Sequence, residues 1–434
     1  MEQKQDNKME KIVSLCKRRG FVFPGSEIYG GLAGFYDFGP LGVEMKNNLK
    51  KLWWDWMTRD HENIVGIDGA IITNPKVWEA SGHIKSFVDP LVECKKCHHR
   101  FKADDIEEKK CPDCGGELTE PKTFNILVPT ELGVVEGEKI RAYLRGEACQ
   151  TIYLDFKNVL NSSRLKIPFG ICQIGKAFRN EVTPGNFLFR QREFEQWDLQ
   201  WFCHPDEMKK WFEYWKEERM NWFRSLFNHP ENLGFYKHEK LAHYAKDAYD
   251  IEYLASPIAN GKEMEGIHWR GDWDLSGHAK YSGEDLSYTD PETGEKFIPN
   301  IVETSGGVDR AFLFLLLDAY TEEEDRIVLK LDPKVAPYKV AVFPLLKNKP
   351  ELVEKARGIY KELKKRFNTA WDDRGNIGKR YYAQDEIGTP YCVTVDFDSL
   401  EKGTVTVRDR DSMKQETVGI VDLEKYLKEK IMGV

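Results

Sequence analysis

Four cysteines in two pairs are the most direct chemical signal in the sequence. Cys94-Lys-Lys-Cys97 and Cys111-Pro-Asp-Cys114 are separated by thirteen residues. Each pair spaces two thiolates for one tetrahedral Zn2+, and the second pair completes four ligands. Gly115 permits the tight turn that aims backbone N–H groups at the sulfurs. Because four thiolates leave no open coordination position, we predict a structural zinc site on Cys94, Cys97, Cys111 and Cys114.

Two alternatives remain for this segment. The run from Cys94 to His98 also matches a haem c attachment motif, although the second cysteine pair and the absence of an export signal argue against it. His98 or His99 could replace one sulfur as a zinc ligand.

A second group combines arginines, carboxylates and an aromatic ring over residues 177–202. If this stretch is a hairpin with its turn at residues 183–185, side chains two apart share a face. One face then carries Arg179, Glu181, Arg192, Phe194, Gln196 and Asp198. Arginine binds phosphate through two parallel hydrogen bonds, and an aromatic ring can stack on a base. The alternative is a surface ladder of cross-strand ion pairs.

A third group lies before an apolar helix. Glu303 and Ser305 alternate onto one face, the glycines at 306 and 307 allow close approach of a ligand, and Arg310 opens the helix. A packed strand, turn and helix with a solvated arginine would give the same pattern. No phosphate-binding loop of the Walker type is present, because Gly175-Lys176-Ala177 lacks the upstream glycine and the following Ser or Thr.

These segments resemble the three motifs of class II aminoacyl-tRNA synthetases. Phe178-Arg-Asn-Glu181 with Arg192-Glu-Phe194 is similar to motif 2, Gly306 to Arg310 with its helix to motif 3, and the strand ending at Pro75 to motif 1, the dimer-interface element. Within the class, the chain resembles the single-subunit homodimeric glycyl-tRNA synthetases. That resemblance rests on the stretches 18–31, 39–44, 80–83, 303–305 and 385–391.

The resemblance implies roles for the motif residues. Arg179 would hold the α-phosphate of ATP, Glu181 would read the adenine amino edge, and Arg192 would contact the phosphates. Phe194 would stack on adenine, with Arg310 on its other face near the γ-phosphate. Mg2+ would accompany ATP, with carboxylates near Glu303 among its contacts.

The same resemblance implies how the amino acid is recognised. Glycine has only an ammonium and a carboxylate to grip, and the family uses acidic residues and a serine, here Asp198, Glu265, Glu303 and Ser305. This chain departs from the family at Asp198, where a glutamate is usual, so the shorter side chain must sit closer or act through water. One methyl contributes only roughly 1–3 kcal/mol as lost contact, so rejecting alanine needs a rigid pocket.

The elements that must position these groups suggest an α+β protein. The resemblance implies an antiparallel-sheet catalytic core in two parts, residues 1–91 and 121–334, interrupted by a zinc ribbon at 92–120. Residues 335–434 alternate strand and helix, which predicts an α/β domain with a mostly parallel sheet, similar to anticodon-binding domains. Five cations of this domain are candidate tRNA contacts: Arg374, Lys379, Arg380, Arg408 and Arg410.

Composition limits the class of protein. Of 434 residues, 41% are hydrophobic and 31% charged, with a formal net charge of −8, which excludes a uniformly basic coat. The apolar run 311–317 is far shorter than the roughly 18–20 residues of a membrane helix. Five cysteines are scattered and no apolar signal region opens the chain. We therefore expect a reduced, cytoplasmic protein without a membrane segment.

The resulting hypothesis is a homodimeric glycine–tRNA ligase that uses ATP, glycine and tRNA(Gly). Two alternatives are a synthetase for another small amino acid, and a non-catalytic relative that only binds nucleic acid. The motif arginines at 179 and 310 favour a catalytic protein.

Overall fold

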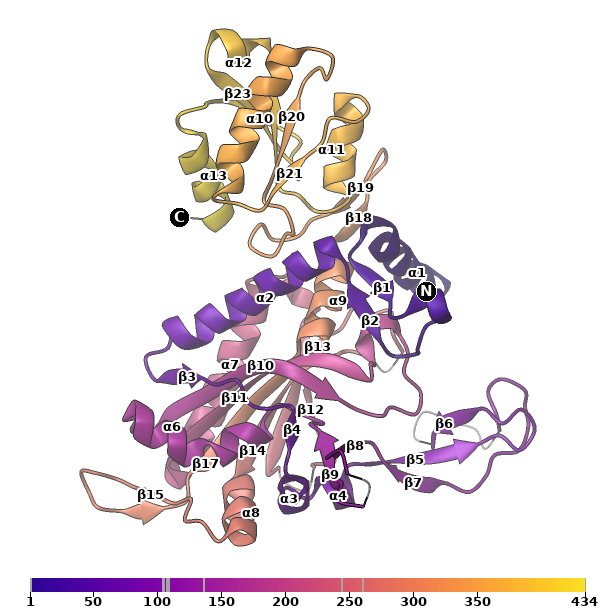
Figure 1. Cartoon of the computed structure of the whole chain (residues 1–434), viewed down its shortest axis with the longest axis vertical. Helices are drawn as coiled ribbons and strands as arrows, with labels where there is room; N and C mark the ends of the chain where they lie inside the picture. Colours follow the sequence, from indigo (N-terminus) through magenta and orange to yellow (C-terminus); the bar gives the residue numbers. More distant parts are fainter. Residues whose placement is uncertain are drawn as a thin grey trace.

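A seven-stranded sheet forms the centre of the molecule in the computed structural model (Figure 1). The structure describes residues 2–103, 106, 110–135, 137–242, 245–259 and 261–433, with side chains from residue 8 onward. The strand order is β12-β13-β14-β17-β11-β10-β3, antiparallel throughout except between β10 and β3. The strands are β3 (Ile64–Gly66), β10 (Phe169–Phe178), β11 (Glu193–Cys203), β12 (Leu233–Lys237), β13 (Asp247–Tyr253), β14 (Glu263–Gly271) and β17 (Asn300–Gly307).

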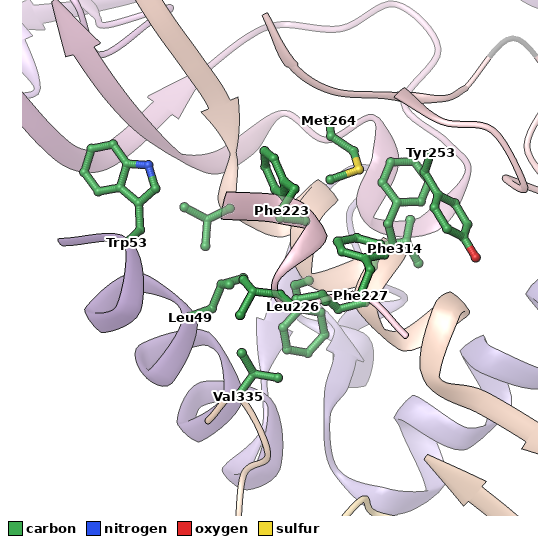
Figure 2. Packing of buried hydrophobic residues seen from close by; sticks show 14 of the residues in the cluster. Leu49, Trp53, Phe223, Leu226, Phe227, Tyr253, Met264, Phe314 and Val335 are labelled. Atoms are coloured by element: carbon green, nitrogen blue, oxygen red, sulfur yellow. The ribbon is translucent and has the colours of Figure 1, made fainter. Parts of the chain in front are cut away.

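The two faces of this sheet have different surroundings. On one face, Trp197, Leu199 and Trp201 of β11 are buried against long helices, as expected for residues that alternate with Phe194, Gln196 and Asp198. These helices are α1 (Glu2–Arg19), α2 (Pro40–Arg59), α7 (Met208–Arg224) and α9 (Val308–Ala319). Figure 2 shows Leu49 and Trp53 of α2 in this core, together with aromatic side chains of α7 and α9. This is the main hydrophobic core of the molecule.

The opposite face is only partly covered. Its apolar part packs against the shorter helices α5 (Gln150–Leu154), α6 (Phe156–Ser163) and α8 (Trp273–Ser282). Phe202 of β11 and Ile301 of β17 belong to this smaller cluster. The same face of β11 and β17 carries polar residues toward the other end of the strands, and the candidate site lies there.

Two small sheets flank the core. The sheet β4-β9-β8 contains β4 (Ile72–Thr73), β8 (Val128–Leu132) and β9 (Ile140–Leu144). The sheet β6-β5-β7 contains β5 (Val88–Glu93), β6 (Arg100–Lys102) and β7 (Lys122–Asn125), and projects from the side of the core (Figure 1). Residues 104, 105 and 107–109 of the predicted 92–120 module, and the chain ends 1 and 434, lie outside the described residues.

The strand expected to end at Pro75 is short. Only Ile72–Thr73 forms β4, and Pro75 opens helix α3 (Pro75–Ala80), with the Asn74 side chain accepting a hydrogen bond from the Lys76 N–H. Proline suits the first helical position because its missing N–H has no partner there in any case. The remaining core elements are β1 (Val22–Pro24), β2 (Tyr36–Phe38), α4 (His83–Ser86), β15 (Tyr288–Thr289), β16 (Lys296–Phe297), β18 (Tyr320–Glu322) and β19 (Ile327–Leu329).

The C-terminal domain is a second α/β unit at one end of the long axis (Figure 1). Its sheet has the order β21-β20-β22-β23-β24. The prediction of a mostly parallel sheet is wrong in part, because only β21, β20 and β22 are parallel. The connections 396–403 and 410–414 are shorter than the roughly dozen residues that a parallel crossover needs, although the first contains the short helix α12, so β22, β23 and β24 pair antiparallel. The elements are β20 (Val340–Pro344), α10 (Pro350–Lys364), β21 (Thr369–Trp371), α11 (Ile377–Asp385), β22 (Tyr391–Val395), α12 (Phe397–Glu401), β23 (Thr404–Asp409), β24 (Gln415–Gly419) and α13 (Leu423–Met432).

Buried ion pairs join this domain to the core. Arg326, between β18 and β19, donates to the carboxylate of Asp385 at 2.7 Å, and Arg408 donates to the same carboxylate at 2.8 and 3.0 Å. Asp385 has no exposed surface. Since β18 follows α9 directly, the helix that begins at the candidate site continues into this joint. The predicted α+β class is confirmed, and none of the described helices has the length and apolarity to cross a membrane.

Candidate functional site

A cavity opens where the polar end of the sheet meets the loop after β10 and the first turn of α9. Of the predicted residues, its lining includes Arg179, Glu181, Phe194, Ser305 and Arg310. These residues come from segments up to about 130 positions apart in the chain, and the antiparallel register of β11 with β17 brings them together. The spacing prediction placed Arg179 and Glu181 on a strand, but β10 ends at Phe178 and both lie in the following loop.

Arg179 lies between two aromatic rings at the cavity wall. Its guanidinium carbon is 5.1 Å from the centre of the Phe87 ring and 5.3 Å from that of Phe194. Its Nε donates to the Gly146 carbonyl at 3.1 Å. Cation–π contacts and one backbone bond fix the side chain while it borders the cavity, which is the arrangement needed to present N–H donors to a phosphate.

Arg192 has a different position from the one predicted. Its Nε and Nη2 donate to the Glu181 carbonyl at 3.1 and 2.9 Å, and its Nη1 donates to the Ala33 carbonyl at 3.2 Å. These bonds tie the loop that carries Glu181 to the N-terminal segment. Arg192 therefore positions the loop in this structure, and phosphate contact by Arg192 stays a prediction.

Arg310 lies in the first turn of α9 and faces the cavity. Its Nη1 pairs with Glu263 Oε1 at 2.9 Å, and its guanidinium lies 4.4 Å from the centre of the Phe189 ring. The positive charge of Arg310 is the main cause that holds the pKa of Glu263 below its usual value. Sequence reasoning did not single out Glu263 or Phe189, because nothing in their local pattern marks them as neighbours of Arg310.

The residue before Arg310 anchors the helix start. Asp309 is buried, and its Oδ1 lies 2.5 Å from the Lys46 ammonium. Its Oδ2 accepts from the Glu195 N–H at 3.0 Å and from Gln191 at 3.2 Å. A negatively charged side chain in the first helical turn also interacts favourably with the positive end of the helix dipole. These contacts fix α9 against β11 and so fix where Arg310 points.

Next to Ser305 of the cavity lining, buried acidic side chains form a group on the same sheet face, which we call the acidic pocket. Asp198 of β11 is opposite Ser305 of β17, and Gln200 is opposite Glu303. Gln200 donates to Asp198 Oδ1 at 2.5 Å and to Glu303 Oε1 at 2.9 Å. Asp198 Oδ2 is buried and has no hydrogen-bond partner among the described residues. A buried carboxylate oxygen without a donor is costly, which indicates a place for a ligand that donates.

The two carboxylates of this pocket, Glu303 and Asp198, differ in their charged neighbours. Burial alone would raise the pKa of Glu303, but Arg270 and His268 lower it to about 2. Arg270 donates to Glu303 at 2.9 and 3.0 Å, and His268 lies 2.7 Å from Glu303 Oε2. Burial and the nearby negative charge of Glu303 instead raise the pKa of Asp198 well above its usual value. The pocket thus lacks one positive charge, and an ammonium group can supply it.

Glu265 lies away from this pocket, on the other face of the sheet. In the register it is opposite Gly306 of β17, which is opposite Trp197 of β11, so Glu265 shares the Trp197 face. Both of its oxygens are engaged, by Arg219 at 2.5 and 2.9 Å and by the Trp197 Nε1 at 2.8 Å. The structure therefore does not bring Glu265 to Asp198, Glu303 and Ser305. A Cβ at Gly306 would lie 2.8 Å from Glu265 Oε2, so glycine is required there.

The four paired cysteines gather into a cluster at the far end of β5. Cys94 and Cys114 sulfurs are 3.5 Å apart, and Cys97 and Cys111 sulfurs are 3.6 Å apart. Tetrahedral Zn2+ with Zn–S bonds of about 2.3 Å requires sulfur separations of about 3.8 Å, so the four residues fit the ion. The backbone N–H of Cys97 lowers the pKa of the Cys94 thiol to about 6, which favours the thiolate.

The two histidines of this segment point to carboxylates. His98 Nδ1 lies 3.3 Å from Glu93 and His99 Nδ1 lies 2.5 Å from Asp113. All four sulfurs lie within 4.8 Å of one another, so a complete ligand set forms without either histidine.

Comparisons with known proteins found two matching family models and several relatives that cover almost the whole chain. A family model described as "tRNA synthetase class II core domain (G, H, P, S and T)" matches residues 134–320, and one described as "Anticodon binding domain" matches residues 339–430. The glycine–tRNA ligase of Borreliella burgdorferi is 53% identical over 439 residues, covering 98% of each chain. Those of Thermobifida fusca and Treponema denticola are 50% and 51% identical over 456 and 440 residues, with 98% of this chain covered and 98% and 97% of theirs.

Proposed function

The chain belongs to the glycine–tRNA ligase family of class II aminoacyl-tRNA synthetases, and on this basis we propose that it charges tRNA(Gly) with glycine. In the first step the glycine carboxylate attacks the α-phosphorus of ATP. A bond from that oxygen to phosphorus forms, the bond to the pyrophosphate oxygen breaks, and glycyl-adenylate results. The nucleophile is already ionised, so the enzyme supplies positioning and positive charge rather than a strong base.

The cavity provides the parts for binding ATP. Phe194 stacks on the adenine ring, Glu181 accepts from the adenine amino group, and Arg179 holds the α-phosphate at the reacting centre. Arg310 binds the outer phosphates, releasing Glu263 from their present ion pair. Mg2+ bound with ATP neutralises phosphate charge, and the Glu263 carboxylate offers the oxygen ligands that this ion prefers.

The acidic pocket provides the site for glycine. The ammonium donates to the unpartnered Asp198 Oδ2 and lies near Glu303, while Ser305 bonds the amino acid from the neighbouring strand. This single observation, a fully buried carboxylate oxygen of Asp198 without a hydrogen-bond donor among the described residues, carries the proposal. Glu265 lies on the other face of the sheet, where it accepts hydrogen bonds from Trp197 and Arg219 and so fixes the positions of both side chains.

In the second step the 3′-terminal ribose hydroxyl of tRNA attacks the adenylate carbonyl and AMP leaves. The C-terminal domain binds the anticodon end of the tRNA. Of the five predicted cations, Arg380, Arg408 and Arg410 are buried and hold the domain together, which makes them unsuitable as contacts. Arg374 and Lys379 are exposed and remain candidates.

The assembly and the metal are also part of the proposal. Exposed apolar side chains gather on the sheet β4-β9-β8 and its turn, where a second copy of the chain would cover them in a homodimer. They are Ile71, Ile72, Leu132, Val134, Val135 and Ile140. Zn2+ on the four cysteines would hold the β5–β6 hairpin together, and the protein would act in the cytoplasm.

Charging of tRNA with radiolabelled glycine tests this function. The wild-type protein should form glycyl-tRNA with ATP, and Arg179→Ala should lose adenylate formation at least about 100-fold while tRNA binding, measured by filter retention, stays unchanged. Arg59→Ala serves as a matched control, because it removes an exposed arginine that pairs with Asp55 of its own helix and does not line the cavity. Charging with another small amino acid, or tRNA binding without any charging, would establish one of the two alternatives instead.

A further inference from the structure

A groove of about 740 Å3 lies in the C-terminal domain, between α10 and the start of α13. Both helices pack on the face of the domain's sheet opposite α11. Apolar side chains line much of the groove. Ile359, Leu363 and Leu423 are buried there, whereas Leu400 and Val421 are 41% and 93% exposed. Exposed apolar side chains gathered at a groove mark an interaction surface.

The groove is open because Gly358, in the middle of α10, has no side chain. A Cβ at Gly358 would meet no atom within 4 Å, so packing inside the protein does not require glycine there. Its helical backbone does not require glycine either, and glycine is less favourable than alanine in a helix interior. A partner that approaches the backbone of α10 closely would account for this residue.

The border of the groove is acidic. Among the described residues, neither Glu351 nor Glu354 forms an ion pair, whereas Glu362 pairs with Lys365 and Glu424 with Arg366. Negative charge repels the phosphates of RNA and attracts lysine and arginine side chains. The charged residues of the lining are four glutamates and one lysine, namely Glu351, Glu354, Glu362, Glu424 and Lys355.

The length of the groove matches one short helix. From Glu351 to Leu363 its lining follows α10 for about 18 Å, at 1.5 Å per residue. A partner helix of about twelve residues, or roughly three turns, has this length. Amphipathic helices bind such grooves through apolar side chains at positions i, i+3, i+4 and i+7.

We propose that this groove binds a basic amphipathic helix of another protein. The apolar side chains of that helix pack on Leu400 and Val421, and its backbone passes over Gly358. Its lysine or arginine side chains pair with Glu351 and Glu354. No residue of the catalytic cavity takes part, so this binding is separate from the activation of glycine.

Fluorescence anisotropy of the full-length protein with a labelled peptide tests the groove. The probe is a helix of about twelve residues with leucine at positions i, i+3, i+4 and i+7 and lysine elsewhere. In 0.15 M salt, the wild type should bind it at least about tenfold more tightly than a peptide of the same composition without an apolar face. Equal binding of the two peptides would overturn the proposal, because charge alone would then explain it.

Filling the groove gives the decisive variant. Gly358→Leu should weaken binding of the amphipathic peptide at least about tenfold, and unchanged affinity would overturn the proposal. Gly378→Leu is the matched control, since Gly378 lies in α11 and its Cβ would meet no atom closer than 3.7 Å. Leucine is the better helix former, so both variants should keep or raise the melting temperature of the wild type.

Two further measurements test the chemistry of the partner. Glu351→Gln combined with Glu354→Gln should weaken the lysine peptide at least about fivefold, because two negative charges leave the border. Unchanged affinity would overturn the assignment of a basic partner. Sedimentation velocity tests a second copy of the chain as the occupant. Self-association that is lost in Gly358→Leu but kept in Gly378→Leu would make the groove a contact between copies and would overturn the proposal.

Discussion

Two buried carboxylates on opposite faces of the same sheet differ in how completely the protein itself satisfies their hydrogen bonds. Glu265 and Asp198 are both fully buried and lie in neighbouring rows of the same register. Glu265 has every oxygen bonded, with Arg219 as a counter-ion within the protein. Among the described residues, Asp198 has one oxygen without a hydrogen-bond donor, and its other oxygen is bonded by the neutral Gln200. The first group stabilises the fold, whereas we propose that the ammonium of glycine completes the second.

Removing the charge of Asp198 should have the largest effect on activity. Asp198→Asn keeps the shape but leaves the glycine ammonium without its partner, and losing one partner of a buried charged pair costs roughly 2–5 kcal/mol. We expect kcat/KM for glycine to fall about 100-fold or more, and the melting temperature to stay the same or rise. Steady-state exchange kinetics and calorimetry measure the two quantities, and a large loss of stability with normal kinetics would reverse the assignment.

Removing the charge of Glu265 should instead affect stability. Glu265→Gln leaves Arg219 buried without a counter-ion, and breaking a buried pair costs roughly 3–5 kcal/mol of unfolding free energy. Urea unfolding of this variant should show that loss, and the protein that remains folded should keep a near-normal KM for glycine. The double variant Glu265→Leu with Arg219→Met is the control, and should recover much of the stability.

A smaller effect on activity is expected at the joint between the domains. Asp385 is another buried carboxylate with both oxygens bonded, here by Arg326 and Arg408. Asp385→Asn leaves Arg408 buried without a counter-ion and should lower the free energy of unfolding by roughly 3–5 kcal/mol. Adenylate formation should change little, because the joint is at the far end of α9 from Arg310. If ATP–pyrophosphate exchange falls strongly when variant and wild type are compared at equal folded concentration, the joint also positions the cavity.

The smallest effect concerns Lys339, a partly buried cation with no carboxylate in ion-pair contact among the described residues. Lys339 donates to the carbonyls of Lys334 and Ala336, and burial lowers its pKa to about 8 from 10.5. Between these values the folded protein binds fewer protons than the unfolded chain, so stability rises with pH by at most about 1.4 kcal/mol per pH unit. Urea unfolding from pH 8 to 10 should show this slope in the wild type and a shallower slope in Lys339→Met.

The sequence predicted correctly which side chains of one strand share a face of the sheet. It was less informative about which side chains of different strands lie next to each other. Alternation along β11 correctly assigned Phe194 and Asp198 to one face and Trp197 to the other. It could not assign Glu265, because the face of a residue on β14 depends on a register with β17 that only the folded sheet defines. The neighbours of Arg310, namely Glu263 and Phe189, are likewise long-range contacts without a local signal.

Buried cations were the other limit of the prediction. Arg380, Arg408 and Arg410 were candidates for tRNA contact, with a solvated charged face as the alternative, yet each bonds carbonyls or carboxylates inside its own domain. Arginine occurs both on nucleic-acid surfaces and in buried ion pairs, so residue type alone does not separate the two. The spaced cysteine pairs were more informative, since their spacing alone predicts a four-sulfur cluster and the structure forms one.

Amino-acid-dependent ATP–pyrophosphate exchange is the most direct test of the central claim that the open carboxylate of Asp198 is the glycine site. Wild-type protein would be assayed with glycine, alanine, serine, proline and threonine in parallel, beside Asp198→Asn and Glu265→Gln at equal folded concentration. The account predicts exchange with glycine alone, lost in Asp198→Asn and retained in Glu265→Gln. Exchange that survives in Asp198→Asn but fails in Glu265→Gln would contradict it.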